Sequence, residues 1–146
     1  MSLPRQGLSQ REASYLVALV KMRGQARTGT RILAERFGVR EASVVDVVRR
    51  LEEKGLLRRE PWRSISLTRR GEVLAEKILH NHRVVETYFH RVLKLGVALA
   101  CREAQKIDYL LDNDTVMSMC SILDYPTQCI HGEEIRHGWC LARKRG

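Results

Sequence analysis

A histidine and a carboxylate stand four residues apart near the middle of this chain. In the segment Asn81-His82-Arg83-Val84-Val85-Glu86, His82 falls on an apolar stripe at helical spacing and Glu86 follows about one turn later. Residues four apart on a helix share a face, so the imidazole and the carboxylate point into one space. The pair is either a structural contact or half of a metal site, since such nitrogen and oxygen donors hold transition metals.

A second expected helix carries donors that can complete such a site. Cys101, Gln105 and Asp108 share one of its faces, at spacings of four and then three residues. If this face packs against the His82 face, Cys101 adds a sulfur donor and Asp108 an oxygen donor. Both residues are therefore candidate metal ligands.

The tail contains a third group, Cys129-x-His131, with Cys140 beyond it. This spacing lacks the paired Cys-x-x-Cys of a structural zinc module, so two interpretations stay open. The residues are either metal ligands or incidental thiols on a surface loop. We expect ligation by Cys129 and His131, because free exposed cysteines are reactive. The spacing does not show whether the tail residues join the His82 site or build a second one.

Three helices must position these groups. The periodicity predicts a long helix over 69–95 that is ended by Gly96, and another over 98–111. A third helix is expected to begin after Asn113 or Asp114, either of which can cap it, and to end before Pro126. Cys120 lies among apolar residues of that helix and is expected to be part of the core.

The first half of the chain has a different pattern. A capping box at Ser9-Gln10-Arg11-Glu12 starts a helix that runs to about Met22. Residues 28–71 then read as two short helices around a turn at Gly38, followed by strands over 56–60 and 65–68. This order predicts a winged helix-turn-helix, whose second helix enters the major groove of DNA. The expected fold is mainly α: a winged helix-turn-helix over 1–71, then an all-α domain over 72–146.

The charge agrees with a nucleic-acid partner. Up to Gly71 the chain has 16 Lys and Arg against 7 Asp and Glu, while the rest has 10 of each. The whole excess of positive charge therefore lies on the half with the helix-turn-helix, where phosphate contacts release counterions. A solvated basic face without a partner, and an ordinary surface helix, are the alternatives.

The helix expected over 41–54 buries a stripe of valines and Leu51 and leaves a polar face. That face and the turn between the strands supply the candidate DNA contacts. We expect Arg40, Ser43 and Asp46 to approach base edges. Phosphates are expected to contact Arg49, Arg50 and Arg63.

Composition excludes several other classes of protein. No apolar run is long enough to span a bilayer, and no secretory leader is evident, so a cytoplasmic location is expected. In a reducing compartment, four cysteines are unsuited to a disulfide framework. The residues contain no nucleophile–base constellation and no phosphate-cradling glycine loop, so we do not expect an enzyme.

These motifs together resemble the diphtheria toxin repressor and manganese transport regulator family of metal-dependent transcriptional repressors, in its short two-domain form. The resemblance covers roughly residues 10–139. It rests on Arg31-Ile32-Leu33-Ala34-Glu35, on Leu51-Glu52-Glu53-Lys54-Gly55-Leu56, on Ile65-Ser66-Leu67-Thr68 with Gly71, and on Ser43 with Val44. The segment His82-Arg83-Val84-Val85-Glu86 looks like the family's His-Arg-x-x-Glu. Cys129-Ile130-His131-Gly132 looks like the Cys-Pro-His-Gly of many members.

The resemblance implies a homodimer that binds a palindromic DNA operator when a divalent metal is bound. His82 and Glu86 match two ligands of one family site, often called ancillary, and Cys101 stands where its third ligand is usually histidine. The family's other site fits poorly, because its positions hold Ser14, Gln105, Asp108 and Tyr109. Only Asp108 keeps comparable chemistry.

The replaced ligands bear on which metal is expected. Sulfur in place of nitrogen favours Fe²⁺, Zn²⁺ or an iron–sulfur cluster over Mn²⁺. We therefore expect a metal-responsive repressor. The alternatives are a redox or iron–sulfur sensor on the same fold and a metal-carrying or architectural DNA-binding protein.

Overall fold

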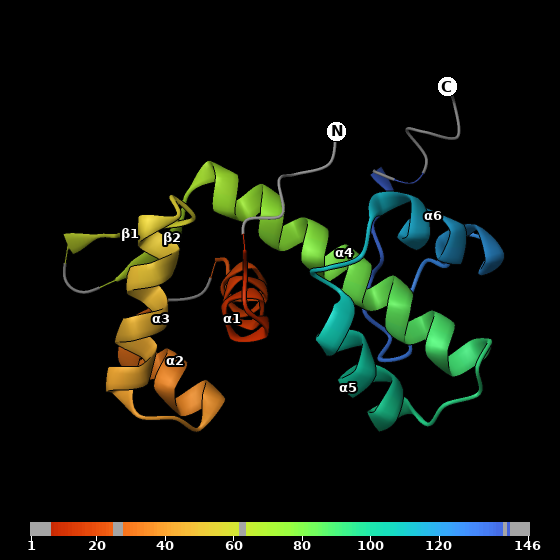
Figure 1. Cartoon of the computed structure of the whole chain (residues 1–146), viewed down its shortest axis with the longest axis horizontal. Helices are drawn as coiled ribbons and strands as arrows, with labels where there is room; N and C mark the ends of the chain where they lie inside the picture. Colours follow the sequence, from red (N-terminus) through yellow and green to blue (C-terminus); the bar gives the residue numbers. More distant parts are fainter. Residues whose placement is uncertain (1–6, 25–27, 62–63, 139, 141–146) are drawn as a thin grey trace. The chain divides into compact units, whose positions relative to one another are not determined.

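The computed structural model describes residues 7–24, 28–61, 64–138 and 140. In chain order its elements are α1 Gln10–Lys21, α2 Thr30–Phe37, α3 Glu41–Glu53, β1 Leu57–Arg59, β2 Ile65–Leu67, α4 Arg69–Arg91, α5 Val97–Ile107 and α6 Asn113–Ile122 (Figure 1). The expected fold class, mainly α with a winged helix-turn-helix first, is confirmed. The described residues form two compact units, 7–76 and 77–140, which we call the N-terminal and C-terminal units. The sequence placed its boundary at residue 71, whereas these units divide within α4.

Local signals set the helices of the N-terminal unit. The expected capping box starts α1, because the Ser9 hydroxyl accepts from the Glu12 backbone N–H and the Glu12 carboxylate accepts from the Ser9 N–H. Gly38, in the left-handed conformation with φ 62°, ends α2 as predicted. The next helix, α3, begins at Glu41 after a short turn. These helices meet in a core whose fully buried members are Leu16, Leu33, Val44, Val47, Val48 and Leu51.

The wing is a two-stranded antiparallel sheet in which Leu57 faces Leu67 and Arg59 faces Ile65. Each strand has three residues, which is shorter than the sequence suggested. The flanking residues serve other contacts instead: Leu56 is fully buried, and its carbonyl accepts a hydrogen bond from the Thr68 N–H.

Gly71 lies where the wing returns to α4. A Cβ atom placed on this residue would collide with the Leu56 carbonyl group, so only glycine allows the two backbones to approach this closely. This close approach gives a physical reason for the glycine that the sequence motif singled out.

In the C-terminal unit, α4 ends four residues earlier than the predicted limit of Leu95. Lys94 adopts the left-handed conformation with φ 61°, and the Leu95 N–H bonds back to the Phe89 carbonyl, which closes the helix without a glycine. The next helix, α5, ends at Ile107 instead of Leu111, because the Leu110 and Leu111 N–H groups both turn back to the Ile107 carbonyl.

The predicted cap of α6 was also wrong, because Asp112 occupies the N-cap position and Asn113 is already helical. The core around α6 consists of Val84, Val116, Cys120, Cys129, Ile135 and Cys140. Cys120 is thus buried in the core, as expected. After α6, residues 123–138 run mostly without regular structure, with one bridge between Gln128 and Glu134. None of the described helices has the length and apolar character needed to cross a membrane.

Candidate metal centre and nucleic-acid interface

The side chain of Glu86 is the centre of the predicted ligand group. It projects from α4 and is 1% exposed, an unusual environment for a carboxylate. One carboxylate oxygen, Oε2, lies 3.1 Å from His82 Nε2. The Cys101 sulfur, from α5, lies 3.6 Å from the same imidazole nitrogen. His82, Glu86 and Cys101 therefore bring nitrogen, oxygen and sulfur donors together, within 4.8 Å of one another.

The other carboxylate oxygen of Glu86 faces the tail. Its Oε1 lies 3.3 Å from His131 Nδ1, and the sulfur of Cys129 completes a second group of three donors. Arg83 holds this loop against α4: its guanidinium donates to the Glu133 carboxylate at 2.8 Å and to the Glu134 carbonyl at 2.7 Å. The tail donors thus adjoin the His82 group through Glu86.

Asp108 occupies a different position from the other predicted ligands. Its carboxylate lies 3.1 Å from His82 Nδ1, the ring nitrogen on the other side from Glu86 and Cys101. Asp108 is not a member of either donor group. A carboxylate in this position fixes the ring and its tautomer, because it accepts the Nδ1 proton and leaves the Nε2 lone pair facing the other donors.

This tautomer leaves two acceptors facing each other. Glu86 Oε2 is buried and receives no well-aligned hydrogen bond from the residues that the structure describes, although His82 Nε2 is near it. A carboxylate oxygen and an imidazole lone pair at this distance repel unless a cation lies between them. Either a proton on Nε2 or a metal ion satisfies that requirement. The donor set therefore fits a metal.

The pKa values of His82 and Glu86 indicate that, without a metal, a proton on His82 supplies the positive charge between the donors. Burial opposes charge on His82, but hydrogen bonds and charges from Asp108 and Glu86 outweigh it and raise the pKa of His82 to about 9. Burial likewise opposes charge on Glu86, while His82, with help from Cys129 and His131, lowers the pKa of this carboxyl to about 2. Without a metal, His82 is therefore an imidazolium between two carboxylates at neutral pH.

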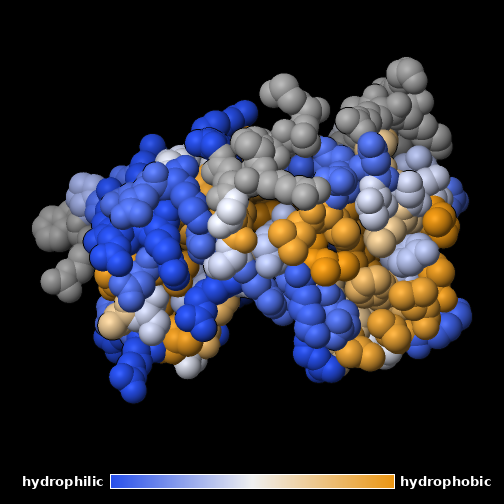
Figure 2. Space-filling model, in the orientation of Figure 1, coloured by the Kyte–Doolittle hydropathy of each residue, from blue (hydrophilic) through white to orange (hydrophobic). Residues whose placement is uncertain are grey.

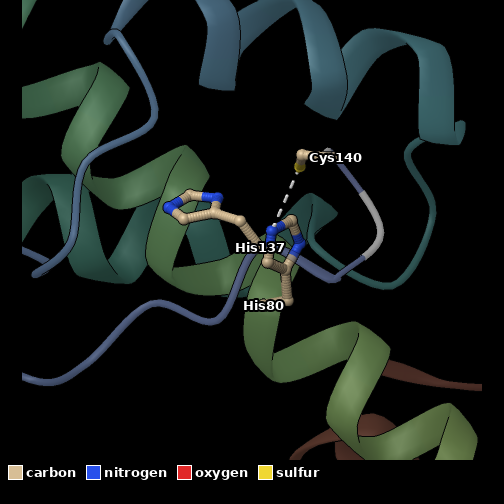
Figure 3. A group of neighbouring side chains, drawn as sticks. All are labelled: His80, His137 and Cys140. Atoms are coloured by element: carbon tan, nitrogen blue, oxygen red, sulfur yellow. Dashed lines mark hydrogen bonds between the residues drawn. The ribbon is translucent and has the colours of Figure 1, made fainter. Parts of the chain in front are cut away.

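Cys140 lies in a separate cluster with His80 and His137, two residues that the sequence reasoning missed (Figure 3). The neighbouring thiol of Cys120 lowers the pKa of Cys140, and the same contact, together with burial, raises the pKa of Cys120. The spacing His137-x-x-Cys140 was the signal that could have found this cluster. Among the positions matched to the family's other site, Gln105 is exposed, whereas Asp108 is buried against His82.

The helix-turn-helix places its predicted DNA contacts on the open side of α3. Arg40, Asp46, Arg49 and Arg50 are exposed and Ser43 is half-buried, while the valine stripe faces the core. Asp46 and Arg49 pair with each other at 3.3 Å. Figure 2 shows hydrophilic side chains covering much of the visible face of this unit. The remaining candidate, Arg63, lies outside the described residues.

A winged helix-turn-helix followed by a helical unit with a buried Cys, His and Glu group defines a transcriptional regulator with a ligand site of its own. Comparison with known families agrees with this class. Residues 68–137 match the family described as "Iron dependent repressor, metal binding and dimerisation domain", and residues 3–78 match "Sugar-specific transcriptional regulator TrmB". The chain belongs to the diphtheria toxin repressor and manganese transport regulator family of metal-dependent transcriptional repressors.

Two curated relatives illustrate this membership. The transcriptional regulator MntR of Escherichia coli O6:H1 is 33% identical over 100 residues, which are 67% of this chain and 61% of the relative. The iron-dependent repressor IdeR of Mycobacterium tuberculosis is 29% identical over 103 residues, 70% of this chain and 45% of IdeR. The chain thus spans less than two thirds of the length of these relatives.

Solved structures share the fold. The hypothetical protein SSo2273 from Sulfolobus solfataricus superposes with a TM-score of 0.70 at 27% identity, covering 88% of this chain and 99% of that one. The manganese regulator SloR superposes with a TM-score of 0.79 at 23% identity, over 87% of this chain and 60% of SloR. Because SloR is only 23% identical to this chain, the similarity shows a shared fold and no more.

Proposed function

We propose that this protein is a metal-responsive transcriptional repressor that binds a palindromic DNA operator as a homodimer. The observation that carries the proposal is the buried Glu86 carboxylate, with a different group of nitrogen and sulfur donors at each of its oxygens. A structural ion pair gives no reason for thiols to join the carboxylate and the imidazoles. Thiolate, imidazole and carboxylate groups are all ligands of transition metals, so a metal site accounts for the whole set.

The residues that would hold the metal are His82, Glu86 and Cys101 on one side and Cys129 and His131 on the other. We assign Asp108 an orienting role, because it contacts the other ring nitrogen of His82. When bound, a divalent cation supplies the positive charge that the facing donors require. Thiolate and imidazole donors favour Fe²⁺ or Zn²⁺ over Mn²⁺. The relatives' names mention iron and manganese, so all three ions belong in the test.

Control of DNA binding would depend on α4. This helix supplies His82 and Glu86, and its first turns, up to Glu76, belong to the N-terminal unit. Ligands from α4, α5 and the 129–131 loop gathered at one site restrict the movement of these segments. We propose that metal occupancy thereby shifts the population of the protein toward the DNA-binding conformation.

On the DNA, Arg49 and Arg50 would hold phosphates, while Arg40, Ser43 and Asp46 would approach base edges. Their exposure along α3 supports these roles. Arg63 keeps its proposed phosphate role from the sequence alone. Because chromosomal DNA is the proposed partner and the relatives are regulators, we also propose a cytoplasmic location and no enzymatic activity.

An operator can be obtained even when the regulated genes are not known. Duplexes from a random pool are selected with the purified protein in separate Zn²⁺, Fe²⁺, Mn²⁺ and chelator arms, and the enriched sequence is footprinted. We expect a protected palindrome in a metal arm and none with chelator. Protection without a discrete palindrome would instead indicate an architectural DNA-binding protein.

The metal centre is then tested on the selected operator. Glu86→Gln keeps the size of the side chain and removes its charge, so we expect the metal-dependent increase in affinity to disappear while metal-free binding stays unchanged. Glu103→Gln, which removes a carboxylate of α5 paired with Lys106, is the matched control and should respond like wild type. A wild-type metal response in Glu86→Gln would exclude the proposed centre.

The redox alternative has less support. All four cysteines are described and none of them forms a disulfide, and Cys101 and Cys129 belong to different donor groups. No three cysteines share one donor group, so the arrangement favours a mononuclear metal over a cluster held by thiolates.

A further inference from the structure

A second set of donors, which does not include Glu86, converges in the C-terminal unit. It comes from three segments: His80 from α4, Cys120 from α6, and His137 and Cys140 from the tail. The Cys140 sulfur lies 3.4 Å from His80 Nε2, and the Cys120 sulfur lies 3.3 Å from His137 Nδ1. Figure 3 shows the His80 ring and the Cys140 thiol facing each other, with His137 beside them.

These distances have a chemical meaning. In a tetrahedral zinc site the metal–sulfur and metal–nitrogen bonds place a sulfur and a nitrogen ligand about 3.6 Å apart. The two sulfur–nitrogen separations observed here are close to that value. The donor atoms of His80, His137 and Cys140 all lie within 4.8 Å of one another, and Cys120 adds a second sulfur beside His137.

Both imidazoles present a lone pair to the cluster. His137 Nε2 is hydrogen-bonded to the Pro126 carbonyl, so Nε2 carries the proton and Nδ1 faces Cys120 as an acceptor. The Asn81 side-chain oxygen lies 3.5 Å from His80 Nδ1, so a proton on Nδ1 would face an acceptor and leave the Nε2 lone pair toward Cys140. Outer partners of this kind orient histidines that ligate metals.

Composition separates this cluster from the Glu86 centre, and most of its donors are buried. Cys120 is fully buried, Cys140 is 1% exposed and His80 is 8% exposed. The group of His80, His137 and Cys140 contains no carboxylate, and with Cys120, which neighbours His137, the donors are two sulfurs and two nitrogens. Four protein ligands of these types leave no open position, which is the property of a structural zinc site.

We propose that His80, Cys120, His137 and Cys140 form a structural zinc site, distinct from the Glu86 centre, that fastens the C-terminal tail to α4 and α6. This inference does not depend on the proposed DNA-binding function. A zinc ion there would hold the tail that carries Cys129 and His131 on α4 whatever the state of the Glu86 centre.

The test uses Co²⁺ as a spectroscopic substitute for zinc in the full chain. In a Cys101→Ser/Cys129→Ser variant the remaining thiols are Cys120 and Cys140, so any thiolate-to-cobalt absorption must come from the proposed site. We expect tetrahedral cobalt bands that saturate at one equivalent and disappear when Zn²⁺ is added. Adding Cys140→Ser to this variant should weaken Co²⁺ binding. The loss should exceed the roughly 10–100-fold that follows removal of a residue hydrogen-bonded to a metal ligand.

Two results would overturn the proposal. One is a cobalt titration without thiolate absorption. The other is a mass lower by two hydrogens that reductant restores, because it would identify a disulfide between Cys120 and Cys140. If a variant fails to fold, the wild-type protein decides: Zn²⁺ should protect Cys120 and Cys140 from alkylation, and equal labelling with zinc and with chelator would exclude the site. The cobalt titration and the alkylation experiment do not involve DNA. The zinc-site proposal can therefore fail without affecting the proposed repressor function.

Discussion

At the scale of single residues, His82 as a proposed ligand would couple metal binding to pH. Its pKa is raised to about 9, above the ordinary value of 6.5, so a metal must displace a proton from Nε2 below that pH. We predict that metal affinity, measured by competition with a chromogenic chelator, rises about tenfold per pH unit between roughly pH 7 and 9. An affinity that is constant over this range would contradict a role for His82 as a ligand.

The same shift predicts how stability changes with pH in the metal-free protein. The pKa of His82 is higher in the folded protein than in the unfolded chain, so protonation of His82 stabilises the folded state. This stabilisation is fully present below about pH 6.5 and is lost as the pH rises through about 9. Urea unfolding should show a loss on the order of 2 kcal/mol between these limits. His82→Gln should remove this part of the pH dependence.

Asp108 is predicted to act through His82. Asp108→Asn keeps the size of the side chain but weakens its hold on the Nδ1 proton, so metal affinity should fall roughly 10–100-fold. Isothermal titration measures the change. Asp124→Asn, an exposed substitution in the same unit, is the control, and an equal loss in both variants would show a general effect on the fold.

At the scale of the elements, α3 carries the predicted DNA contacts. Reversing the charge of Arg49 and Arg50 together should greatly weaken operator binding and lower the slope of log affinity against log salt by about two. Anisotropy titrations at several salt concentrations measure both. Arg102→Glu, an exposed change on α5, should leave the slope nearly unaltered. If the double variant behaves like that control, α3 does not face the DNA.

The junction of the wing with α4 depends on one glycine. Gly71→Ala places a methyl group against the Leu56 carbonyl, so we expect a destabilisation of about 1–3 kcal/mol in denaturant unfolding. Gly96→Ala is the matched control, because nothing lies within 4 Å of its added Cβ atom. The two variants should therefore differ clearly in their unfolding midpoints.

Sequence predicted the elements well where the signals were local. The capping box at Ser9 and the glycine stop at Gly38 fix helix ends through contacts a few residues apart. The end of α4 was missed because Lys94 adopts a conformation that usually identifies glycine. The sequence pattern around a helix end does not show when a residue other than glycine adopts the left-handed conformation.

The candidate site followed the same rule. His82 and Glu86 were predictable as a pair because helical spacing alone brings them together. Their meeting with Cys129 and His131 depends on how the tail folds back on α4, which no spacing reveals. Asp108 was placed correctly near His82, but an imidazole has two nitrogens, and the sequence does not say which one a carboxylate contacts.

At the scale of the whole molecule, apolar side chains favour assembly through the C-terminal unit. Six of the exposed large hydrophobic residues described here belong to this unit: Val92, Leu93, Val97, Leu99, Leu110 and Ile122. Figure 2 shows hydrophobic side chains gathered on the visible face of this unit. Exposed apolar surface of this kind marks protein interfaces.

We therefore predict that Leu93→Asp, at 52% exposure, shifts the proposed homodimer toward a monomer in light scattering. Ile32→Asp, a similar change at 41% exposure in the N-terminal unit, should keep the dimer. A monomeric wild-type protein, or an unaffected Leu93→Asp dimer, would place the interface elsewhere.

The continuity of α4 limits how this protein can be divided for use in fusions. Glu72 and Glu76 lie beyond the wing, yet both pair with Arg23 in the N-terminal unit. A DNA-reading module excised at the end of the wing would lose both partners and keep only the first turn of a helix. A transferable module should therefore end after residue 76, and a chimaeric regulator should be joined within the helix, in phase with its turns.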